Sequence, residues 1–259
     1  MLQKLLLINL AILLSLSSAY ATDLTLRKYT NVKIFYEQNT KDAIEIAKKY
    51  KLPPAALLAI AGLESGYGSG YVSQITGNIL SLGAFKSDAE LPALYLPYSK
   101  SKKMVLFDPA KIKKHPKNDL VWKKRPKSLK RDYRPAPYAG TKDNLALLSH
   151  NKKLQYKANQ ACFIDFSTRW IVSTSNIKVF KNTRVWLDDL VKKEGIKALF
   201  SADTNHKFID KIGGVPNSFN YRKTWPKKVK FIMNRAGLIA LTNSMEFNSM
   251  SFAKAWSKR

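Results

Sequence analysis

The carboxylate of Glu64 stands where a long apolar run meets a glycine-rich turn. Every residue from Ala55 to Leu63 is apolar or glycine, and Gly66, Gly68 and Gly70 follow Glu64 at alternate positions. A helix that is apolar all round is buried in a core, so the run predicts a buried helix that ends near Glu64. Burial and the negative end of a helix dipole both disfavour a charged carboxylate. We therefore expect a raised pKa for Glu64, which suits a general acid working near neutral pH.

Other catalytic patterns are weak or missing in the sequence. The histidines His115, His150 and His206 are widely separated and have no Cys or His partner at ligand spacing, so we expect neither a metal site nor a cofactor. The residues around Ser65 do not match the G-x-S-x-G pattern of serine hydrolases, and the glycines do not match a dinucleotide-binding loop. The alternative for Glu64 is an exposed carboxylate at a frayed helix end. The uniformly apolar sequence before Glu64 and the glycine-rich turn after it favour the interpretation as a general acid.

The first 21 residues have the three parts of a signal peptide. Lys4 supplies the positive start, residues 5–16 form an apolar centre, and Ala19-Tyr20-Ala21 is a small-x-small cleavage site. The apolar centre is short for a membrane span, so an uncleaved anchor is the lesser alternative. We expect an exported protein, periplasmic or secreted, that begins at Thr22.

The formal net charge of the chain is +27. An exported protein this basic is expected to meet anionic partners, namely peptidoglycan carboxylates or an anionic wall or membrane surface. Export argues against nucleic acid. The basic residues are densest from Lys111 to Arg134, which predicts either a patch that holds an anionic surface or a solvated loop. The single Cys162 cannot form an internal disulfide, so the fold depends on its core.

The pattern along the chain predicts one mainly α (α+β) domain over residues 22–241. Helical periodicity over 40–50 precedes the buried run, and prolines with short apolar runs indicate a small β-lobe and basic insertion at about 84–134. Further helices are expected over 141–150, 163–172 and 183–200, and a last core helix over 227–241. Residues 242–259 are expected to form a loosely held tail.

Three patches carry a resemblance to a known family. The first is Leu63-Glu64-Ser65-Gly66-Tyr67-Gly68-Ser69-Gly70 followed by Gly77-Asn78-Ile79-Leu80-Ser81-Leu82-Gly83, and the others lie at 131–156 and 220–229. Together they resemble the bacterial glucosaminidase family, lysozyme-like enzymes that cleave the glycan of peptidoglycan. The nearest subgroup is that of the Bax-like proteins of Gram-negative bacteria. The resemblance spans roughly 42–241, and it departs from the family between Asn78 and Gly83, where the spacing is longer and Ser81-Leu82 replaces a usual aromatic residue.

The resemblance implies a lysozyme-like helical domain with a small β-hairpin lobe beside a cleft. It implies that Glu64 is the catalytic acid and places Tyr221, from the third patch, at the site. Tyr67, Asn78 and Ser65 would then bind the sugars. For Tyr221 the alternative is a core aromatic residue, and for Tyr67 it is packing against the core.

Glycoside cleavage normally needs a second group for the other face of the sugar. Four candidate carboxylates come from the expected β-region: Asp88, Glu90, Asp108 and Asp119. Asp108 is the first choice because it follows the apolar run 104–107, although an Asp before Pro109 is also a common turn-former. The resemblance offers another route, in which the N-acetyl group of the substrate takes this role and Tyr221 orients it.

The sequence thus predicts an exported hydrolase that cleaves the β-1,4 bond after N-acetylglucosamine in peptidoglycan glycan strands. Two alternatives stay open. A lytic transglycosylase shares the Glu-Ser pair at a helix end, although its usual Gly-Leu-Met-Gln-like continuation is replaced here by Gly77-Asn78-Ile79-Leu80. A non-catalytic wall-binding protein of the same fold is the other.

Overall fold

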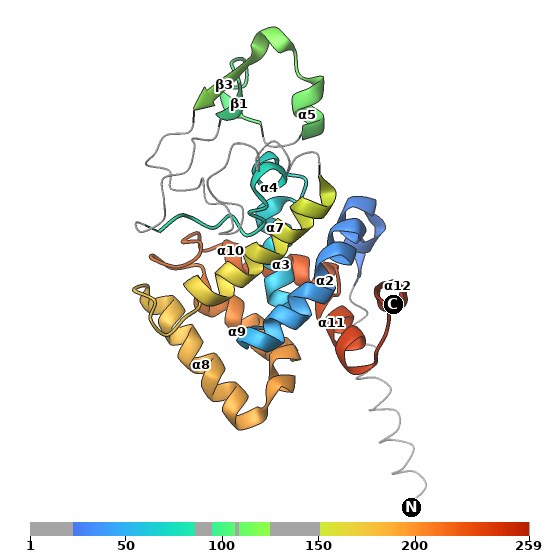
Figure 1. The fold of residues 1–259 in the computed structure, drawn as a ribbon, viewed down its shortest axis with the longest axis vertical. Coiled ribbons are helices and arrows are strands. Elements are labelled where there is room, and N and C mark those ends of the chain that lie inside the picture. Colours follow the sequence, from blue (N-terminus) through green and yellow to red (C-terminus); the bar gives the residue numbers. More distant parts are fainter. Residues whose placement is uncertain (1–22, 86–94, 107–108, 125–150, 259) are drawn as a thin grey trace, which may run out of the picture.

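The computed structural model describes residues 23–85, 95–106, 109–124 and 151–258. These residues form a mainly helical body and one small three-stranded antiparallel sheet (Figure 1). The predicted α+β class is therefore confirmed. The predicted signal peptide, residues 1–21, and the helix expected over 141–150 lie outside the described residues.

The helical body is formed by helices that precede and follow the sheet residues in the sequence. Its elements are η1 (Thr25–Lys28), α2 (Thr30–Tyr50), α3 (Pro54–Ser65), α4 (Tyr71–Thr76), α7 (Lys152–Asp165), η5 (Phe166–Trp170), α8 (Lys178–Glu194), η6 (Ile196–Phe200), α9 (Ala202–Ile212), α10 (Trp225–Arg235), α11 (Leu238–Phe247) and α12 (Phe252–Ser257). Here η1 and η6 are 3-10 helices and η5 is a π-helical turn.

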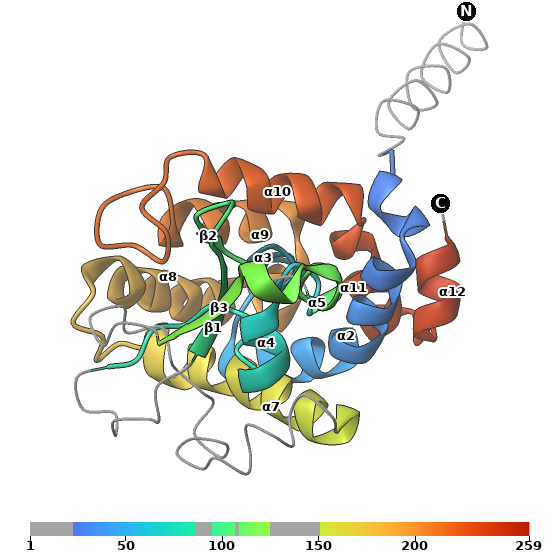
Figure 2. The same ribbon diagram turned by 90° about the horizontal axis from the view of Figure 1, so that it is seen from above.

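Helix α3 is the centre of this body. It packs against α2, α9, α10 and α11, which surround it in both views of the ribbon (Figures 1 and 2). Every residue from Pro54 to Gly62 is buried, so the helix has no solvent face, as its composition predicts. Pro54 occupies the first helical position, where the missing N–H leaves no bond unmade. Burial of each Leu or Ile side chain there stabilises the fold by about 1.5–3 kcal/mol.

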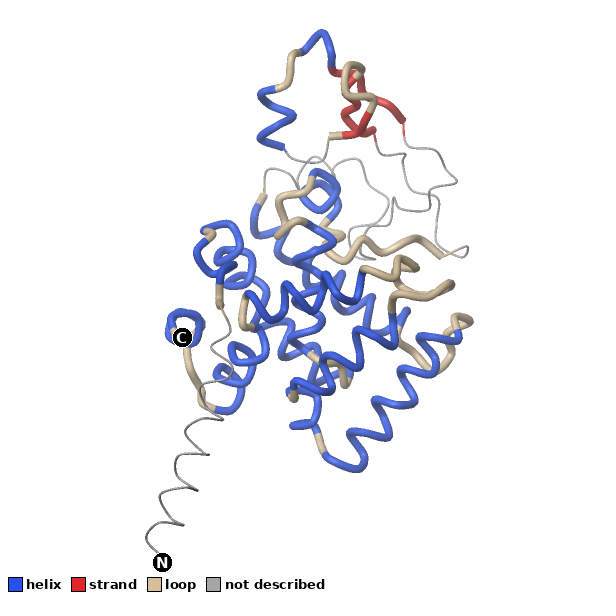
Figure 3. Tube along the Cα trace, turned by 180° about the vertical axis from the view of Figure 1, so that it is seen from behind, coloured by secondary structure: helices blue, strands red, loops and turns tan. Residues whose placement is uncertain are grey.

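The small lobe contains the sheet and lies on the α4 side of the body (Figures 1 and 3). Strand β1 (Tyr95–Ser99) is central, with β2 (Met104–Val105) and β3 (Leu120–Lys124) on its two sides, both antiparallel to it. Helix α5 (Pro109–Lys114) and the 3-10 turn η2 (Lys117–Asp119) connect β2 with β3. The predicted β-hairpin is present as the β1–β2 pair, and β3 extends it into a sheet.

An aromatic contact joins the lobe to the body. The ring of Tyr71, the first residue of α4, lies 5.7 Å from the ring of Trp122 on β3, measured between centroids. Trp122 is 47% exposed. This contact places the sheet next to the segment that follows Glu64 in the chain.

The C-terminal part differs from the prediction in two ways. The expected single helix over 227–241 is two helices, because Gly237 adopts a left-handed conformation, with φ +63°, between α10 and α11. The expectation that residues 242–259 are loosely held is also wrong. Helix α12 buries Phe252 and Trp256, and the Arg27 guanidinium donates to the carbonyl oxygens of Ala255 and Trp256.

Three other helices have boundaries that differ from those predicted. Helix α2 begins at Thr30 rather than at residue 40. The helix expected over 163–172 corresponds to the last three residues of α7 followed by the π-helical turn η5. The helix expected over 183–200 begins at Lys178 and ends at Glu194, because Gly195 has φ +78° and the chain continues as η6.

Candidate active site

Glu64 lies in the last turn of α3 and its side chain is half-buried. The helix ends at Gly66, which has φ +57° and donates its N–H to the Gly62 carbonyl. Because the residues from Pro54 to Gly62 are all buried, the backbone that carries Glu64 is fixed by the core. The structure therefore confirms the predicted setting of this carboxylate, at the end of a buried helix and before a glycine turn.

The turn after Glu64 is held by Ser65. Its Oγ donates to the Ala61 carbonyl at 2.5 Å and accepts the N–H of Gly68 at 2.8 Å. Gly66, Tyr67 and Gly68 are three successive left-handed residues, with φ of +57°, +56° and +71°. Glycine adopts this conformation at little steric cost, whereas Tyr67 does so only because the surrounding structure holds it. Ser65, predicted to bind substrate, is buried and its hydroxyl is engaged in this turn.

A tryptophan from a distant part of the chain holds the Glu64 carboxylate. The Nε1–H of Trp225 donates to Glu64 Oε1 at 2.7 Å. Trp225 is the first residue of α10 and is 3% exposed. An indole N–H can only donate, so Oε1 acts as the acceptor and an acid proton would be carried by Oε2.

Close packing fixes the Trp225 ring. A Cβ atom at Gly213 would lie 2.2 Å from Cε3 of the indole, so only glycine fits there. The ring of Phe219 also packs against the indole, with 5.3 Å between the ring centroids, and it lies 5.6 Å from the ring of Phe166. The hydrogen-bond donor to Glu64 is thus held in place by residues of the loop between α9 and α10 and by η5.

Tyr221, the predicted partner of Glu64, lies four residues before Trp225 in the same loop. The loop is closed by the Gly214 N–H bonded to the Asn220 carbonyl at 2.8 Å. Tyr221 is 69% exposed, and within the described residues its hydroxyl makes no hydrogen bond to Glu64. Its assignment as a catalytic group stays a prediction, and it is not a core aromatic residue.

The other two predicted sugar-binding residues, Tyr67 and Asn78, have different surroundings. Tyr67 is half-buried, packs edge-on against Phe35 and Tyr36 at 6.2 and 6.0 Å between centroids, and lines a pocket. Burial raises the pKa of Tyr67. Asn78 is 3% exposed, and its side-chain amide bonds in both directions to the backbone of Leu82, at 2.8 and 2.9 Å. Asn78 therefore closes its own loop.

Of the four candidates for the second carboxylate, the structure describes Asp119. Asp88, Glu90 and the first choice, Asp108, lie outside the described residues. Asp119 connects several segments of the lobe through its side chain. It accepts hydrogen bonds from Ser99 at 2.7 Å and from Ser101 at 2.8 and 2.9 Å, and it pairs with His115 at 2.5 Å. The bonds from Ser99 and then His115 hold the pKa of Asp119 well below its usual range. Such a carboxylate is a weak base, and we assign it to the lobe structure.

Sequence reasoning missed Trp225. The pair Trp225-Pro226 did carry a signal, because proline is favoured in the first turn of a helix and so marks Trp225 as a residue at a helix start. The third patch drew attention to Tyr221 instead, and no local pattern shows that an indole 161 residues away reaches Glu64.

Comparisons of the chain with known protein families, characterised proteins and solved structures give no match. Within the described ranges, no helix combines the length and apolar character needed to cross a bilayer. The same residues contain no cluster of three or more His, Cys, Asp or Glu side chains suited to a metal ion.

Proposed function

We propose that the protein is an exported glycosidase that cleaves the β-1,4 bond after N-acetylglucosamine in peptidoglycan, with Glu64 as the general acid. The observation that carries this proposal is the hydrogen bond from Trp225 Nε1 to Glu64 Oε1 at 2.7 Å, at the end of a buried helix. A half-buried carboxyl group held by a rigid helix and a rigid indole is the arrangement that directional proton transfer requires.

In the proposed reaction, the Oε2 proton of Glu64 goes to the glycosidic oxygen as the C1–O bond breaks. Positive charge develops on the ring carbon and is met from the other face of the sugar. The acetamido oxygen of the substrate can supply that electron pair, with the exposed Tyr221 hydroxyl orienting it. Water then attacks C1 and returns a proton to the carboxylate of Glu64, which restores the starting state. Asp108 is the alternative group for this second role.

The charge of the lobe supports an anionic polymer as substrate. Residues 95–106 and 109–124 contain nine lysines and a single carboxylate, Asp119. Eight of these lysines are exposed: Lys100, Lys102, Lys103, Lys111, Lys113, Lys114, Lys117 and Lys123. Asp119 is occupied by its hydrogen bonds within the lobe. A positively charged surface on the lobe favours binding of the stem-peptide carboxylates of peptidoglycan or of another anionic wall or membrane surface.

Glu64→Gln tests the proposal, with Glu37→Gln as the matched control. Glu37 is an exposed residue of α2, so its change should leave digestion of purified peptidoglycan at the wild-type rate. Glu64→Gln should lose nearly all digestion while its thermal melting stays close to wild type, because the amide keeps an oxygen that can accept from Trp225. Wild-type turnover in Glu64→Gln would refute the assigned acid.

Mass spectrometry of the products separates the enzymatic alternatives. Reducing N-acetylglucosamine ends support hydrolysis after that sugar, whereas anhydro-muramyl ends support a lytic transglycosylase. Binding of Glu64→Gln to whole peptidoglycan, measured from about 0.05 to 0.5 M salt, tests the lobe. Exposed charges are screened over about 10 Å at 0.1 M salt, so binding through the lysines should weaken steeply. If the wild type binds peptidoglycan in a salt-dependent way but does not cleave it, the alternative of a non-catalytic wall-binding protein is the one supported.

A further inference from the structure

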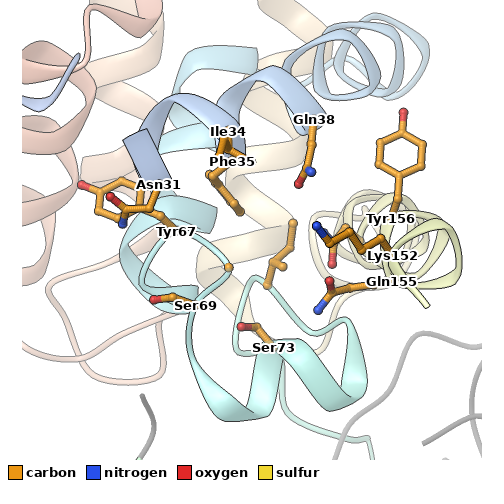
Figure 4. Close-up of a pocket in the computed structure, with 13 residues that line it drawn as sticks. Asn31, Ile34, Phe35, Gln38, Tyr67, Ser69, Ser73, Lys152, Gln155 and Tyr156 are labelled. Carbon is orange, nitrogen blue, oxygen red and sulfur yellow. The ribbon is translucent and has the colours of Figure 1, made fainter. Parts of the chain in front are cut away.

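A pocket of about 240 Å³ lies between α2, the start of α7 and the turn that follows Glu64 in the chain (Figure 4). Neither Glu64 nor Trp225 lines it. Its floor comes from the turn and from the segment after it: Tyr67, Gly68 and Ser69, then Ser73 and Ile79. The pocket is therefore separate from the acid yet built on the same turn.

One wall of the pocket is a stripe on α2. Asn31, Ile34, Phe35 and Gln38 line it, with the spacing of residues that share one helix face. Ile34 is 47% exposed, whereas Phe35 is buried. Asn31 and Gln38 add amide groups at the two ends of this stripe. The wall thus offers an apolar strip between two groups that can both donate and accept hydrogen bonds.

The opposite wall is a stripe of the same spacing on α7: Lys152, Gln155, Tyr156 and Asn159. Figure 4 shows Lys152 and Gln155 directed toward the space that Gln38 faces from α2. Gln155 is fixed by donating to the Gln74 carbonyl at 3.1 Å, and the Tyr156 hydroxyl donates to Asp42. These two bonds hold the wall in place without a ligand.

Asn159, at the inner end of this wall, has an unsatisfied group. The residue is 8% exposed, and its Oδ1 is buried without a hydrogen-bond partner. A buried carbonyl left unpaired is unfavourable, so a ligand N–H or O–H donor that reaches this oxygen forms a hydrogen bond that the described structure lacks. Among the described residues that line the pocket there is no carboxylate.

We propose that this pocket binds one N-acetylated sugar unit of the glycan, as an accessory subsite outside the catalytic centre. The walls combine amides, hydroxyls and aromatic edges, which match the hydroxyls, the acetamido group and the apolar ring face of an amino sugar. The volume is below the range of about 300–1,000 Å³ typical of drug-sized ligands, which fits a single sugar ring. A stem peptide carries several carboxylates, and Lys152 is the one cation among the described lining residues.

This inference rests on the proposed function for its choice of sugar, and its test does not depend on cleavage. The probe is free N-acetylglucosamine, titrated into the full chain carrying Glu64→Gln and followed by NMR of the side-chain amides. We expect shifts at Gln38, Gln155 and Asn159 and a dissociation constant on the order of 1 mM. Glucose and glucosamine, which lack the acetamido group, should bind about ten-fold more weakly.

Two variants show whether the pocket is the binding site. Gln38→Trp fills the space from an exposed position of α2 and should weaken N-acetylglucosamine binding at least about ten-fold. Glu37→Trp, its exposed neighbour, adds the same ring outside the pocket and should leave binding unchanged. Asn159→Leu removes the unpaired carbonyl, so binding should fall about five-fold or more while the melting temperature does not fall.

The results that would overturn the inference are distinct from those that overturn the proposed function. Absent shifts, unchanged binding in both Gln38→Trp and Asn159→Leu, or tighter binding of an alanyl-glutamate dipeptide would each refute the subsite. Cleavage of peptidoglycan by a wild-type protein that binds no free sugar leaves the function standing without the subsite. Sugar-dependent shifts in a protein that never cleaves glycan leave the subsite standing without the enzyme.

Discussion

Replacement of Trp225 by Phe tests whether the indole positions the acid. The change keeps an aromatic ring on the Gly213 and Phe219 side and removes the Nε1–H that donates to Glu64 Oε1 at 2.7 Å. It also removes part of a ring that is 3% exposed. Two separate quantities should respond: the stability of the fold and the rate of the chemical step.

The magnitudes follow from these contacts. A hydrogen bond contributes about 0.5–1.5 kcal/mol when the carboxyl is protonated and about 1.5–3 kcal/mol when it is ionised, and because Glu64 is half-buried, water can replace part of either loss. Lost packing of the smaller ring adds about 1 kcal/mol. We expect the free energy of unfolding to fall by about 2–3 kcal/mol, which corresponds to roughly 5–10 °C in melting temperature for a chain of this size. If the indole aims the acid, a displacement of about 1 Å reduces kcat by up to about 100-fold.

The assay is release of reducing ends from purified peptidoglycan, with kcat and KM measured separately below the melting temperature. Trp186→Phe is the matched control, because Trp186 is a half-buried residue of α8 whose ring packs against Lys211. It should lose stability with little change in kcat. A double-mutant cycle of Trp225→Phe with Glu64→Ala, measured as the free energy of unfolding, isolates the direct interaction, because alanine removes the accepting oxygen. Wild-type kcat in Trp225→Phe would refute a positioning role for the indole.

Three further predictions address the site and the lobe. Gly213→Ala should lower both stability and turnover, because the added Cβ would stand 2.2 Å from the Trp225 ring, whereas Gly195→Ala, with open space around it, should affect stability alone; circular dichroism and reducing-end release measure both. Tyr221→Phe should reduce turnover about ten-fold or more without moving the melting temperature, since the residue is 69% exposed; unchanged turnover removes it from the site. Since hydrogen bonds lower the pKa of Asp119 on folding, its stabilisation should be complete above about pH 4 and be lost as pH falls further; an NMR titration midpoint of its carboxyl near the ordinary 3.9 would contradict this.

The part of the site that lies on one stretch of chain could be predicted from the sequence. Nine apolar or glycine residues followed by Glu64 and alternate glycines specify a buried helix, its end and a glycine-rich turn by local rules alone. The structure has each of these features in the predicted place. The lobe followed in the same way from its prolines and short apolar runs, although the third strand, β3, pairs with β1 across some 25 residues and has no local signal.

What could not be predicted depends on contacts between distant segments. Asn78 and Ser65 are polar residues beside a glycine turn, a pattern equally typical of ligand contacts and of turns that bond to themselves. The structure assigns both side chains to their own loops. The C-terminal residues were too polar to suggest packing, yet Phe252 and Trp256 are buried. The buried set Phe252, Ala255 and Trp256 covers a little more than one helical turn, which is too short for a periodicity argument to detect.

The C-terminal helices connect the helix that carries Trp225, and so the Glu64 carboxyl, to the N-terminal turn η1. Helix α10, which begins with Trp225, packs on α3, on α11 and on η1. Arg27 of η1 donates to the carbonyls of Ala236 and Gly237, at the junction of α10 and α11, and also to those of α12. The N-terminal turn of the described chain and its last helix are thus fastened to the far end of the helix that positions the donor to Glu64. Because those contacts span more than 200 residues, we expect the position of the Glu64 carboxylate to depend on the folded helical body as a whole and not on α3 and its turn alone.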